Sequence, residues 1–450
     1  MRDWTPQELA SAAGADLLRQ AGDRGGPEAV TIDSRQAEPG MLFVGLPGER
    51  VHGGKFATSA LEAGAYGVLT SPEYAEAALT HEQGVILAAA DPLAALQRLA
   101  TAWRDHLGAH VIGVTGSTGK TSTKDLLLAV LSPHRATIAS RANFNTEIGL
   151  PLEILAAPPE TEVLVLEMGM RGRGQIAELA QIARPDVGII VSIGPVHLEL
   201  MGSIEVIAAA KAELITALPA NGTAIVPAGE ALLAPHLRSD IRTVTFGPGG
   251  DVQLRREEAG VVEIDSSGQT IRLEVDFPQS HLRRNLLAAV AAAQAVGVTP
   301  EGRIQLSLSP GRGQQTTLRD GVVLIEDCYN ANPMSMRAAL DDLTRAAASM
   351  AARRVAVLGD MRELGPDAPR FHAEIGAYAS ARADVLVTVG SLAAEMGRAF
   401  HGTHHRAQDA LQAAKLVPSL LEPGDVVLVK GSRSVALEQV CHAVAAGTVA

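Results

Sequence analysis

The stretch Thr115-Gly-Ser-Thr-Gly-Lys-Thr121 decides the fold. It follows an apolar run, His110–Thr115, that predicts a buried strand, and it opens a helical pattern over Lys120–Leu131. A glycine-rich turn between a strand and a helix N-terminus is the setting in which backbone N–H groups bind phosphate. The strict motif has glycine at the position of Val114, yet the context favours a nucleotide-binding loop over a simple surface turn. The residues expected to hold ATP are Gly116, Ser117, Thr118, Gly119, Lys120, Thr121 and Ser122.

Several residues in and after this loop are candidate ligands of the phosphates and of Mg²⁺. Lys120 can reach the β- and γ-phosphates, and the Thr121 hydroxyl can bind Mg²⁺. Glu167 ends the apolar run 163–167, which places its carboxylate at the sheet edge where ligands bind in α/β proteins. His197 follows another apolar run, and Lys211 lies on the helix pattern after it. Taken alone, Lys211 would be a solvated helix lysine.

Alternating strand and helix patterns from residue 110 onward predict an α/β fold with a mostly parallel sheet. Polar alternation over 242–277 predicts an antiparallel edge, and Ser, Pro and Gly near residue 309 indicate a linker before a second α/β series. The 450 residues fit about three domains at roughly 100–200 residues each. We place these domains at 1–108, 109–308 and 309–450.

Composition excludes several classes of protein. Lys and Arg total 38 against 50 Asp and Glu, a net charge of −12 that disfavours nucleic acid and anionic membranes as partners. Cys328 and Cys441 are too few for a disulfide framework or a cysteine-based zinc site. There is no signal-peptide pattern at the N-terminus and no apolar run long enough to span a membrane. We therefore expect a cytoplasmic protein that holds anionic ligands through local positive charge.

Further motifs make the chain resemble the Mur ligase family of peptidoglycan synthesis over nearly its whole length. The resemblance is strongest to the branch that adds D-alanyl-D-alanine, because Tyr329-Asn-Ala-Asn-Pro333 is followed by Gly359-Asp-Met-Arg-Glu-Leu-Gly365. Besides the phosphate loop, the other motifs are Asp33-Ser-Arg35, Pro39-Gly-Met-Leu-Phe-Val-Gly-Leu-Pro-Gly-Glu49, Asn143-Phe-Asn-Thr-Glu-Ile-Gly-Leu-Pro151, Glu167-Met-Gly169, His197-Leu-Glu199, Met201-Gly-Ser203, Ala210-Lys-Ala-Glu213, Gly311-Arg312, Asp327-Cys328 and Lys430-Gly-Ser-Arg433.

The resemblance implies a three-domain architecture. A small α/β N-terminal domain would bind the UDP-muramoyl substrate, a central P-loop ATPase domain would hold ATP, and a C-terminal Rossmann-like domain would close over the site. The implied reaction joins D-alanyl-D-alanine to UDP-N-acetylmuramoyl-tripeptide through an acyl phosphate and yields ADP and phosphate. ATP and two Mg²⁺ ions would be the cofactors, and the protein is expected to be a monomer.

The resemblance also implies catalytic and cofactor-binding roles. Lys120 would stabilise the transferring phosphoryl group, Thr121 and Glu167 would bind one Mg²⁺, and His197 would bind a second. Lys211 matches a position that many family members carbamylate, which would turn a cation into an oxygen ligand. In the nucleotide site, Asn285 matches the residue that hydrogen-bonds adenine, Arg312 matches the arginine that reaches the γ-phosphate, and Asp327 matches the carboxylate that binds the ribose.

The expected substrate contacts lie in all three domains. Ser34 and Arg35 resemble contacts to the UDP-muramoyl part, and three residues of the loop after residue 139 should face the substrate. Four more candidates, two asparagines and two basic residues, follow strands of the last domain. A turn would equally explain the asparagines, and a solvated helix cap would equally explain the basic residues. The candidates outside the first domain are Asn143, Asn145, Thr146, Asn330, Asn332, Lys430 and Arg433.

One segment departs from the family pattern, and two other functions stay open. His52-Gly-Gly-Lys-Phe56 stands where the family usually has Asp-Gly-His, which bears on nucleotide-sugar binding. The chain could instead be a ligase of the same superfamily that adds a single amino acid, although Tyr329-Asn-Ala-Asn-Pro333 argues against this. It could also be a phosphate-loop nucleotide-binding module without ligase activity.

Overall fold

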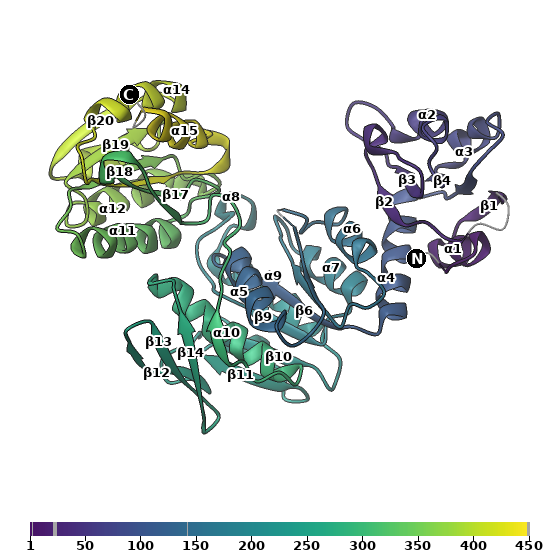
Figure 1. Cartoon of the computed structure of the whole chain (residues 1–450), viewed down its shortest axis with the longest axis horizontal. Helices are drawn as coiled ribbons and strands as arrows, with labels where there is room; N and C mark the ends of the chain where they lie inside the picture. The colour runs from purple at the N-terminus through teal and green to yellow at the C-terminus, as the bar shows by residue number, and fades with distance from the viewer. Residues whose placement is uncertain (2, 21–24, 142, 448–450) are drawn as a thin grey trace.

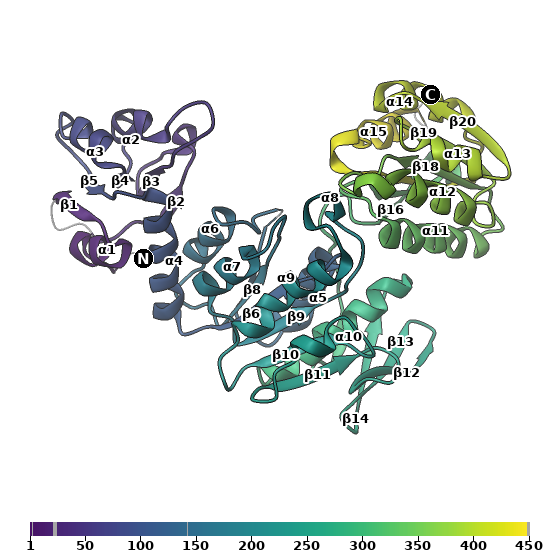
Figure 2. The ribbon, with the colours of Figure 1, turned by 180° about the vertical axis from the view of Figure 1, so that it is seen from behind.

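The computed structural model describes residues 1, 3–20, 25–141 and 143–447. They form three lobes, each built on its own sheet, which follow one another along the chain (Figure 1; Figure 2 gives the view from behind). The predicted divisions near residues 109 and 309 lie in the connections between these sheets. The separation of the sheets supports the predicted boundaries, which stay predictions.

The N-terminal lobe has a sheet of five strands among its described residues, in the order β1-β5-β4-β3-β2. β1 runs antiparallel to β5, and the other neighbours are parallel. β4 and β5 are buried along their whole length, as expected for parallel strands covered on both faces. The elements are α1 (Pro6–Ala13), β1 (Asp16–Arg19), β2 (Ala29–Thr31), β3 (Met41–Gly45), α2 (Ala57–Glu62), β4 (Gly67–Thr70), α3 (Pro72–Ala78), β5 (Val85–Ala88) and α4 (Pro92–Leu107).

The described part of the middle lobe forms one sheet in the order β15-β14-β13-β12-β11-β10-β9-β6-β8-β7. α5 and α10 cover one face, and α6, α7 and α9 cover the other. Its strands are β6 (His110–Thr115), β7 (Thr137–Ala139), β8 (Val163–Glu167), β9 (Val187–Ile190), β10 (Thr223–Pro227), β11 (Arg242–Phe246), β12 (Val252–Glu258), β13 (Val261–Ser266), β14 (Gln269–Val275) and β15 (Gly302–Ile304). Its helices are α5 (Lys120–Leu131), α6 (Gly149–Ala156), α7 (Gln175–Ala183), α8 (Leu198–Met201), α9 (Ile204–Thr216) and α10 (Ser280–Ala295).

The antiparallel part of this sheet is narrower than the sequence predicts. β11 lies in the range expected to be antiparallel but pairs parallel with β10, and the antiparallel pairs are β12 with β13 and β13 with β14. The parallel part therefore extends from β7 to β12, with β6 inside it.

The C-terminal lobe, over residues 314–447, has a six-stranded sheet in the order β16-β17-β21-β18-β19-β20. It is parallel except for β16, and α11, α12 and α13 cover one face while α14 and α15 cover the other. This is the predicted Rossmann-like arrangement. Its elements are β16 (Gln314–Thr317), β17 (Val323–Asp327), α11 (Pro333–Ala348), β18 (Arg354–Gly359), α12 (Ala368–Ala379), β19 (Val385–Val389), α13 (Ala394–Ala399), β20 (Thr403–Ala407), α14 (Ala410–Leu416), β21 (Val426–Lys430) and α15 (Glu438–Gly447).

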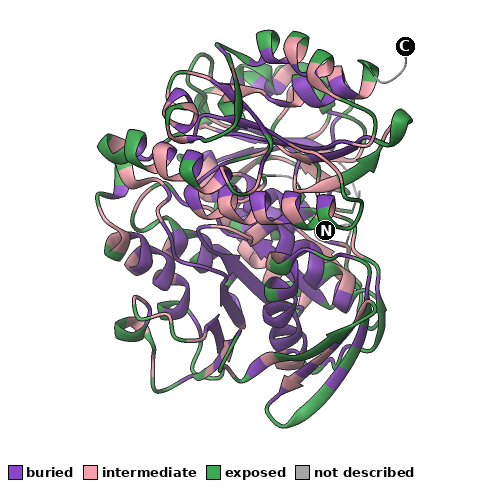
Figure 3. Cartoon of the chain, turned by 90° about the vertical axis from the view of Figure 1, so that its left-hand side faces the viewer, coloured by how far each residue is buried: buried purple, intermediate pink, exposed green. Residues whose placement is uncertain are grey.

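Burial follows the layers of the fold. Figure 3 shows buried residues concentrated in the sheets and on the inward sides of the helices. The edge strands β16 and β20, which the sequence did not reveal, carry polar and largely exposed residues and so lack an apolar run. Among the residues that the structure describes, no helix has both the length and the apolar character needed to span a membrane.

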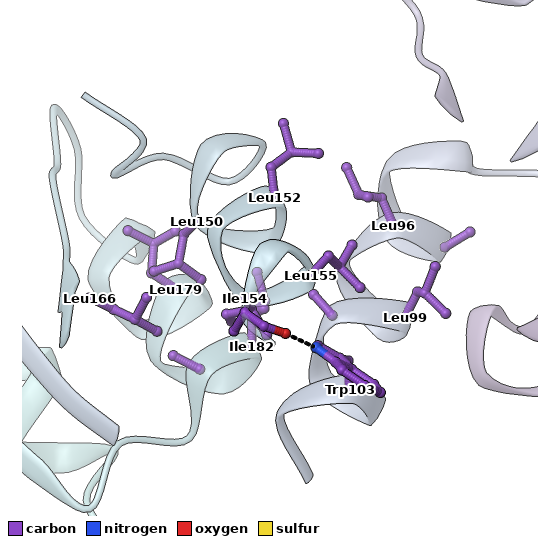
Figure 4. Close-up of a cluster of buried hydrophobic side chains, with 14 of the residues drawn as sticks. Leu96, Leu99, Trp103, Leu150, Leu152, Ile154, Leu155, Leu166, Leu179 and Ile182 are labelled. Atoms are coloured by element: carbon purple, nitrogen blue, oxygen red, sulfur yellow. Dashed lines mark hydrogen bonds between the residues drawn. The ribbon is translucent and has the colours of Figure 1, made fainter. Parts of the chain in front are cut away.

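The N-terminal and middle lobes share one hydrophobic cluster. α4 leaves the N-terminal lobe and packs against α6 and α7, with Leu96, Leu99 and Trp103 at the contact (Figure 4). Trp103 is only 2% exposed, and its indole Nε1 donates a hydrogen bond to the Ala157 carbonyl oxygen at 3.0 Å. Because large apolar side chains fill this joint, the two lobes are held together by packing.

We expect Trp103→Ala to lower the free energy of unfolding by about 3–5 kcal/mol, because it leaves a cavity at the joint. Urea denaturation followed by circular dichroism measures this change. Leu411→Ala is the matched control, since Leu411 is 58% exposed and its truncation should change stability by less than about 0.5 kcal/mol. Equal stability of the two variants would show that the joint contributes little.

Candidate active site

The predicted phosphate loop connects β6 to α5 and is held from both sides. The Ser117 N–H donates to the Ser192 carbonyl oxygen and the Thr118 N–H donates to the Ser192 hydroxyl, both at 2.9 Å. Gly119 has a φ of +79°, and a Cβ there would lie 2.9 Å from the Nδ2 atom of Asn285. Only glycine fits this turn, and its close approach places Asn285 directly against the loop.

Glu167 lies beside the loop because of strand register. β6 and β8 pair in parallel with Val114 opposite Glu167, so the carboxylate is at the strand end next to the loop. The Thr121 hydroxyl donates to Glu167 Oε2 at 2.8 Å, and Asn145 Nδ2 donates to Oε1 at 2.9 Å. Three predicted site residues, from a helix, a strand and a loop, therefore meet at one carboxylate.

This cluster fits a hard divalent cation. Glu167 is only 2% exposed, and within the described ranges no lysine or arginine nitrogen makes an ion pair with it. A buried carboxylate without a contacting cation is costly, and its partners here are neutral hydrogen-bond donors. Carboxylate and hydroxyl oxygens are the ligands that Mg²⁺ prefers. Thr121 and Glu167 therefore offer the oxygen ligands that a hard divalent cation prefers.

Two lysines lie at this edge of the sheet, and burial lowers the pKa of both. The Lys120 Nζ donates to the Gly116 carbonyl oxygen at 2.8 Å; Glu167 raises its pKa and Arg312 lowers it, but burial is the largest cause of its shift. Lys211, on α9, is 2% exposed and has no hydrogen bond or ion pair among the described side chains. Burial holds the pKa of Lys211 well below its usual range, and the charge of Lys120 lowers it further. Lys211 is thus a buried amine whose charged form is disfavoured by burial.

His197 joins the middle lobe to the C-terminal lobe. It precedes α8, which lies close to the C-terminal lobe in Figure 1. Its Nδ1 atom hydrogen-bonds the Oε2 atom of Glu363, and the Glu199 N–H donates to the Glu363 carbonyl oxygen at 3.3 Å. Burial lowers the pKa of His197, while Glu363 acts in the opposite direction. The carboxylate fixes one ring nitrogen and leaves the other for a ligand.

Two arginines of the C-terminal lobe gather on one aromatic ring. The guanidinium carbon of Arg312 lies 3.9 Å from the centre of the Tyr329 ring, and that of Arg433 lies 5.8 Å from it. Arg312 and Asp327 line a small cavity together with His281 at the start of α10. The predicted γ-phosphate and ribose contacts thus lie where the C-terminal lobe faces the middle lobe.

Lys430 and the two asparagines serve the local structure of this lobe. Lys430 is 2% exposed, and its Nζ atom donates to Asp327 Oδ2 at 2.6 Å and to the Asn330 carbonyl oxygen at 3.0 Å. Asn332 caps α11 through a reciprocal pair of hydrogen bonds with Ser335. The Asn330 side chain accepts a hydrogen bond from the N–H of Ala331. Turn and helix-cap geometry accounts for both asparagines, and a substrate contact by Lys430 would require its ion pair to open.

Two candidate substrate contacts lie in the N-terminal lobe, and two more lie on a loop of the middle lobe. Ser34 and Arg35 lie in the short helix Ser34–Gln36, and the Arg35 side chain is 87% exposed. Arg35 donates to Asp33, which lowers the pKa of that carboxyl to about 2. Asn143 and Thr146 lie on an exposed loop of the middle lobe. Neither pair makes a hydrogen bond to the phosphate loop in the described part of the chain.

The segment that departs from the family pattern is ordered by a turn. His52 Nδ1 accepts a hydrogen bond from the Gly54 N–H at 3.0 Å, and the His52 ring packs on Tyr74 with centres 4.5 Å apart. A Cβ on Gly54 would lie 2.5 Å from the Thr70 hydroxyl oxygen, so this position has space for glycine alone. The histidine therefore shapes the loop from within the lobe.

The linker between the middle and C-terminal lobes is fastened to the helix that follows the phosphate loop. Asp125 of α5 accepts hydrogen bonds from the N–H and the hydroxyl of Ser309, at 2.8 and 3.0 Å. Lys124 pairs with the same carboxylate at 2.6 Å, and both charged side chains are nearly fully buried. Sequence patterns located the linker but gave no sign of this anchor, because Asp125 and Ser309 are far apart in the chain.

Comparison with known proteins agrees with this architecture. The Mur ligase family catalytic domain matches residues 28–108, the Mur ligase middle domain matches 114–293, and the Mur ligase glutamate ligase domain matches 311–433. The UDP-N-acetylmuramoyl-tripeptide–D-alanyl-D-alanine ligase of Bacillus subtilis is 37% identical over 91% of this chain and 92% of its own length. The chain belongs to the Mur ligase family.

Solved structures of Mur ligases share the whole arrangement. A MurF from Acinetobacter baumannii superposes with a TM-score of 0.87 at 28% identity, covering 98% of this chain and 99% of the other. MurF ligase from Thermotoga maritima in complex with ADP gives a TM-score of 0.82 at 29% identity, covering 94% and 98%. The three-lobed fold predicted from the sequence is confirmed.

Sequence reasoning missed one contact of this Mur ligase that bears on the site. Glu363 lies in the Gly359-Asp-Met-Arg-Glu-Leu-Gly365 motif, to which the sequence assigned no role. Its φ of +62° shows a left-handed backbone conformation that is uncommon for glutamate, and its side chain reaches His197 of another lobe. The motif itself was the available signal, but its partner could not be inferred without the fold.

We expect Glu363→Ala to lower kcat/KM for ATP-dependent turnover about 10- to 100-fold, because the carboxylate orients the His197 ring. Glu363→Gln, which can still hydrogen-bond the ring, should retain more activity. Steady-state kinetics at several Mg²⁺ concentrations would test this, and the alanine variant should need more Mg²⁺. Glu374→Ala, at an exposed ion pair of the same lobe, is the control. Full activity of Glu363→Ala at low Mg²⁺ would contradict the role.

Proposed function

We propose that this Mur ligase joins D-alanyl-D-alanine to UDP-N-acetylmuramoyl-tripeptide and consumes ATP in peptidoglycan synthesis. The observation that carries the proposal is the near full-length similarity to a Bacillus subtilis enzyme of that name. The convergence of Lys120, Thr121 and Glu167 at one sheet edge supports the use of ATP. The ADP complex of the Thermotoga maritima relative gives independent support.

The first chemical step activates a carboxylate. The terminal carboxylate oxygen of the tripeptide attacks the γ-phosphorus of ATP, the bond to the ADP oxygen breaks, and an acyl phosphate forms. Negative charge accumulates on the transferred phosphoryl group, so catalysis depends on positioning and on cations. Lys120 would stabilise this charge from the phosphate loop. Magnesium, held by Thr121 and Glu167, would neutralise charge on the phosphates when bound.

The second step forms the amide. The amine of D-alanyl-D-alanine attacks the acyl carbon, a tetrahedral intermediate forms and collapses, phosphate leaves, and the amine loses a proton. Holding both substrates at the phosphate loop makes this attack effectively intramolecular, which supplies a large part of the rate. In this proposal Ser34 and Arg35 bind the UDP-muramoyl part. The expected peptide and substrate contacts elsewhere are Asn143, Asn145, Thr146, Asn330, Asn332, Lys430 and Arg433.

Nucleotide binding would use two lobes. Asn285 is suited to bind adenine, because its Nδ2 atom is buried beside the phosphate loop and lacks a hydrogen-bond partner in the described part of the chain. Arg312 is near enough for its charge to act on Lys120, which supports its role at the γ-phosphate. Asp327 would take the ribose. Because these residues belong to different lobes, closure of the C-terminal lobe would complete the site before phosphoryl transfer.

The function is tested by the product formed from ATP, Mg²⁺, UDP-N-acetylmuramoyl-tripeptide and D-alanyl-D-alanine. Mass spectrometry should show the pentapeptide product and one ADP per amide bond. Lys120→Met should slow product formation by at least about 100-fold, because it removes a charge that stabilises the transition state. Parallel reactions with meso-diaminopimelate, L-lysine or L-glutamate in place of the dipeptide should give no amide. An amide with one of these alone would identify a single-amino-acid ligase, and nucleotide binding without any amide would identify a binding module.

We further propose that Lys211 is carbamylated. A neutral amine attacks CO₂ to form a carbamate with release of a proton, and burial favours the neutral amine here. The product would place oxygen atoms and negative charge near His197 and Lys120, where a second Mg²⁺ could bind. The absence of an ionic partner for Lys211 among the described residues supports this role.

Carbon-13 NMR of the protein in ¹³C-bicarbonate tests the modification. We expect a carbamate signal that is present in the native chain, absent in Lys211→Ala, and retained in Lys415→Ala, which removes an exposed lysine of the C-terminal lobe. Lys211→Ala should also lose turnover, and a short carboxylic acid should restore part of it by replacing the missing oxygen ligand. A native protein without the signal, together with full activity of Lys211→Ala, would rule the modification out.

Cellular location and assembly complete the proposal. A reaction that uses ATP and a protein that keeps both cysteines as free thiols fit the reducing cytoplasm. All candidate catalytic and nucleotide-binding residues belong to one chain, so a monomer would suffice for activity.

A further inference from the structure

A second cluster of metal-binding side chains lies in the C-terminal lobe, away from the phosphate loop. Cys328 directly follows β17 and Cys441 lies on α15, and both thiols are buried. Glu326, on β17, contributes a carboxylate oxygen, and the two sulfur atoms and this oxygen all lie within 4.8 Å of one another. This spacing is compatible with one ion at the centre, because zinc–ligand bonds are about 2.0–2.3 Å long.

The side chains of this cluster come from two elements, β17 and α15. Glu326 lies on β17 and Cys328 follows two residues later in the extended chain, so both side chains point to the sheet face that α15 covers. Glu438 and Cys441 are three residues apart on that helix, which places them on one side of it. Glu438 is close enough for its charge to act on the Cys328 thiol. A strand and a helix thus each present one carboxylate and one thiol.

The cluster carries negative charge with little compensation. The Oε2 atom of Glu438 is buried and has no hydrogen-bond partner among the described residues, and its Oε1 atom lies 3.8 Å from an Arg433 nitrogen. The Glu326 side chain makes no hydrogen bond or ion pair in the described part of the chain. A cation bound between these carboxylates and the two thiols would satisfy the unpaired Oε2 atom of Glu438.

We propose that Glu326, Cys328, Glu438 and Cys441 form a binding site for a divalent cation of the zinc class. Two thiolates and two carboxylates match the ligand types and the ligand number of Zn²⁺, with Glu326, Cys328 and Cys441 within 4.8 Å of one another and Glu438 near Cys328 as the fourth ligand, whereas Mg²⁺ prefers oxygen ligands alone. Counting cysteines alone excludes a zinc site in this chain, and carboxylates that complete the set revise that expectation. A disulfide between the cysteines would leave both carboxylates without a partner.

An ion at this site would stabilise the nucleotide-binding end of β17. Asp327 lies between Glu326 and Cys328 in the chain, and Lys430 pairs with it from the neighbouring strand. An ion that joins β17 to α15 would hold this strand end and the following Tyr329 loop in place. The site is separate from the Thr121–Glu167 cluster, which belongs to the middle lobe.

Cobalt titration of the reduced, full-length protein tests the site. Co²⁺ replaces Zn²⁺ and reports thiolate ligands by an intense sulfur-to-cobalt charge-transfer band in the near ultraviolet, which an all-oxygen site does not give. We expect one such Co²⁺ per chain, displaced by Zn²⁺. Cys328→Ser and Cys441→Ser should each greatly weaken the band, and Glu326→Gln and Glu438→Gln should each weaken cobalt affinity at least about 10-fold, while Glu374→Gln should leave it unchanged.

A thermal melt with and without Zn²⁺ gives a second readout. Zn²⁺ should raise Tm of the native protein and leave Tm of the double variant Glu326→Gln/Glu438→Gln unchanged. Because both glutamates are partly exposed, this variant should fold even if the serine variants do not. Absence of the charge-transfer band, or a band that the glutamine substitutions leave unaltered, would overturn the proposal. So would the loss of both thiols to a disulfide in the freshly purified protein.

Discussion

The buried carboxylate of Glu167 is the constraint around which the middle lobe is organised. Parallel pairing of β6 with β8 brings it to the phosphate loop, where Thr121 and Asn145 donate to its two oxygens and no cation makes an ion pair with it within the described ranges. Such a group is expensive to bury, so the hydrogen bonds that Thr121 and Asn145 donate to it stabilise this edge of the sheet. The energetic deficit is largest when the nucleotide and its metal are absent, and it favours their binding.

The two outer lobes relate to this centre in different ways. The N-terminal lobe is joined to it by packing, with Trp103 and its neighbours filling a continuous apolar cluster. The contacts of the C-terminal lobe with it include the hydrogen bond between His197 and Glu363 and the ion pair between His281 and Asp342. Polar contacts break and form at low cost, whereas separating a continuous apolar cluster is costly. Movement between lobes is therefore expected at the C-terminal side, where the proposed closure over ATP would take place.

Local signals predicted the phosphate loop, the acid at the end of β8 and the Rossmann-like lobe, because apolar strands and glycine turns are properties of adjacent residues. Edge strands such as β16 were missed, since their polar residues carry no such pattern. The burial of Lys430 against Asp327 and the contact of Glu363 with His197 could not be predicted, because each joins residues that only the folded chain brings together. The type of each residue indicated the chemistry it could perform. The contacts in the folded chain determine which of these side chains are free to perform it.

The anchor of Ser309 on Asp125 has a consequence for dissecting the protein. A middle domain cut at residue 308 would keep Asp125 and Lys124 but lose the hydroxyl and the N–H that satisfy this nearly buried carboxylate. Asp125 would then keep only its ion pair with Lys124, on the helix that begins with Lys120, so the fragment would be weakened close to its own phosphate loop. A fragment that ends after Ser309 would keep these two hydrogen bonds to the helix that follows the phosphate loop.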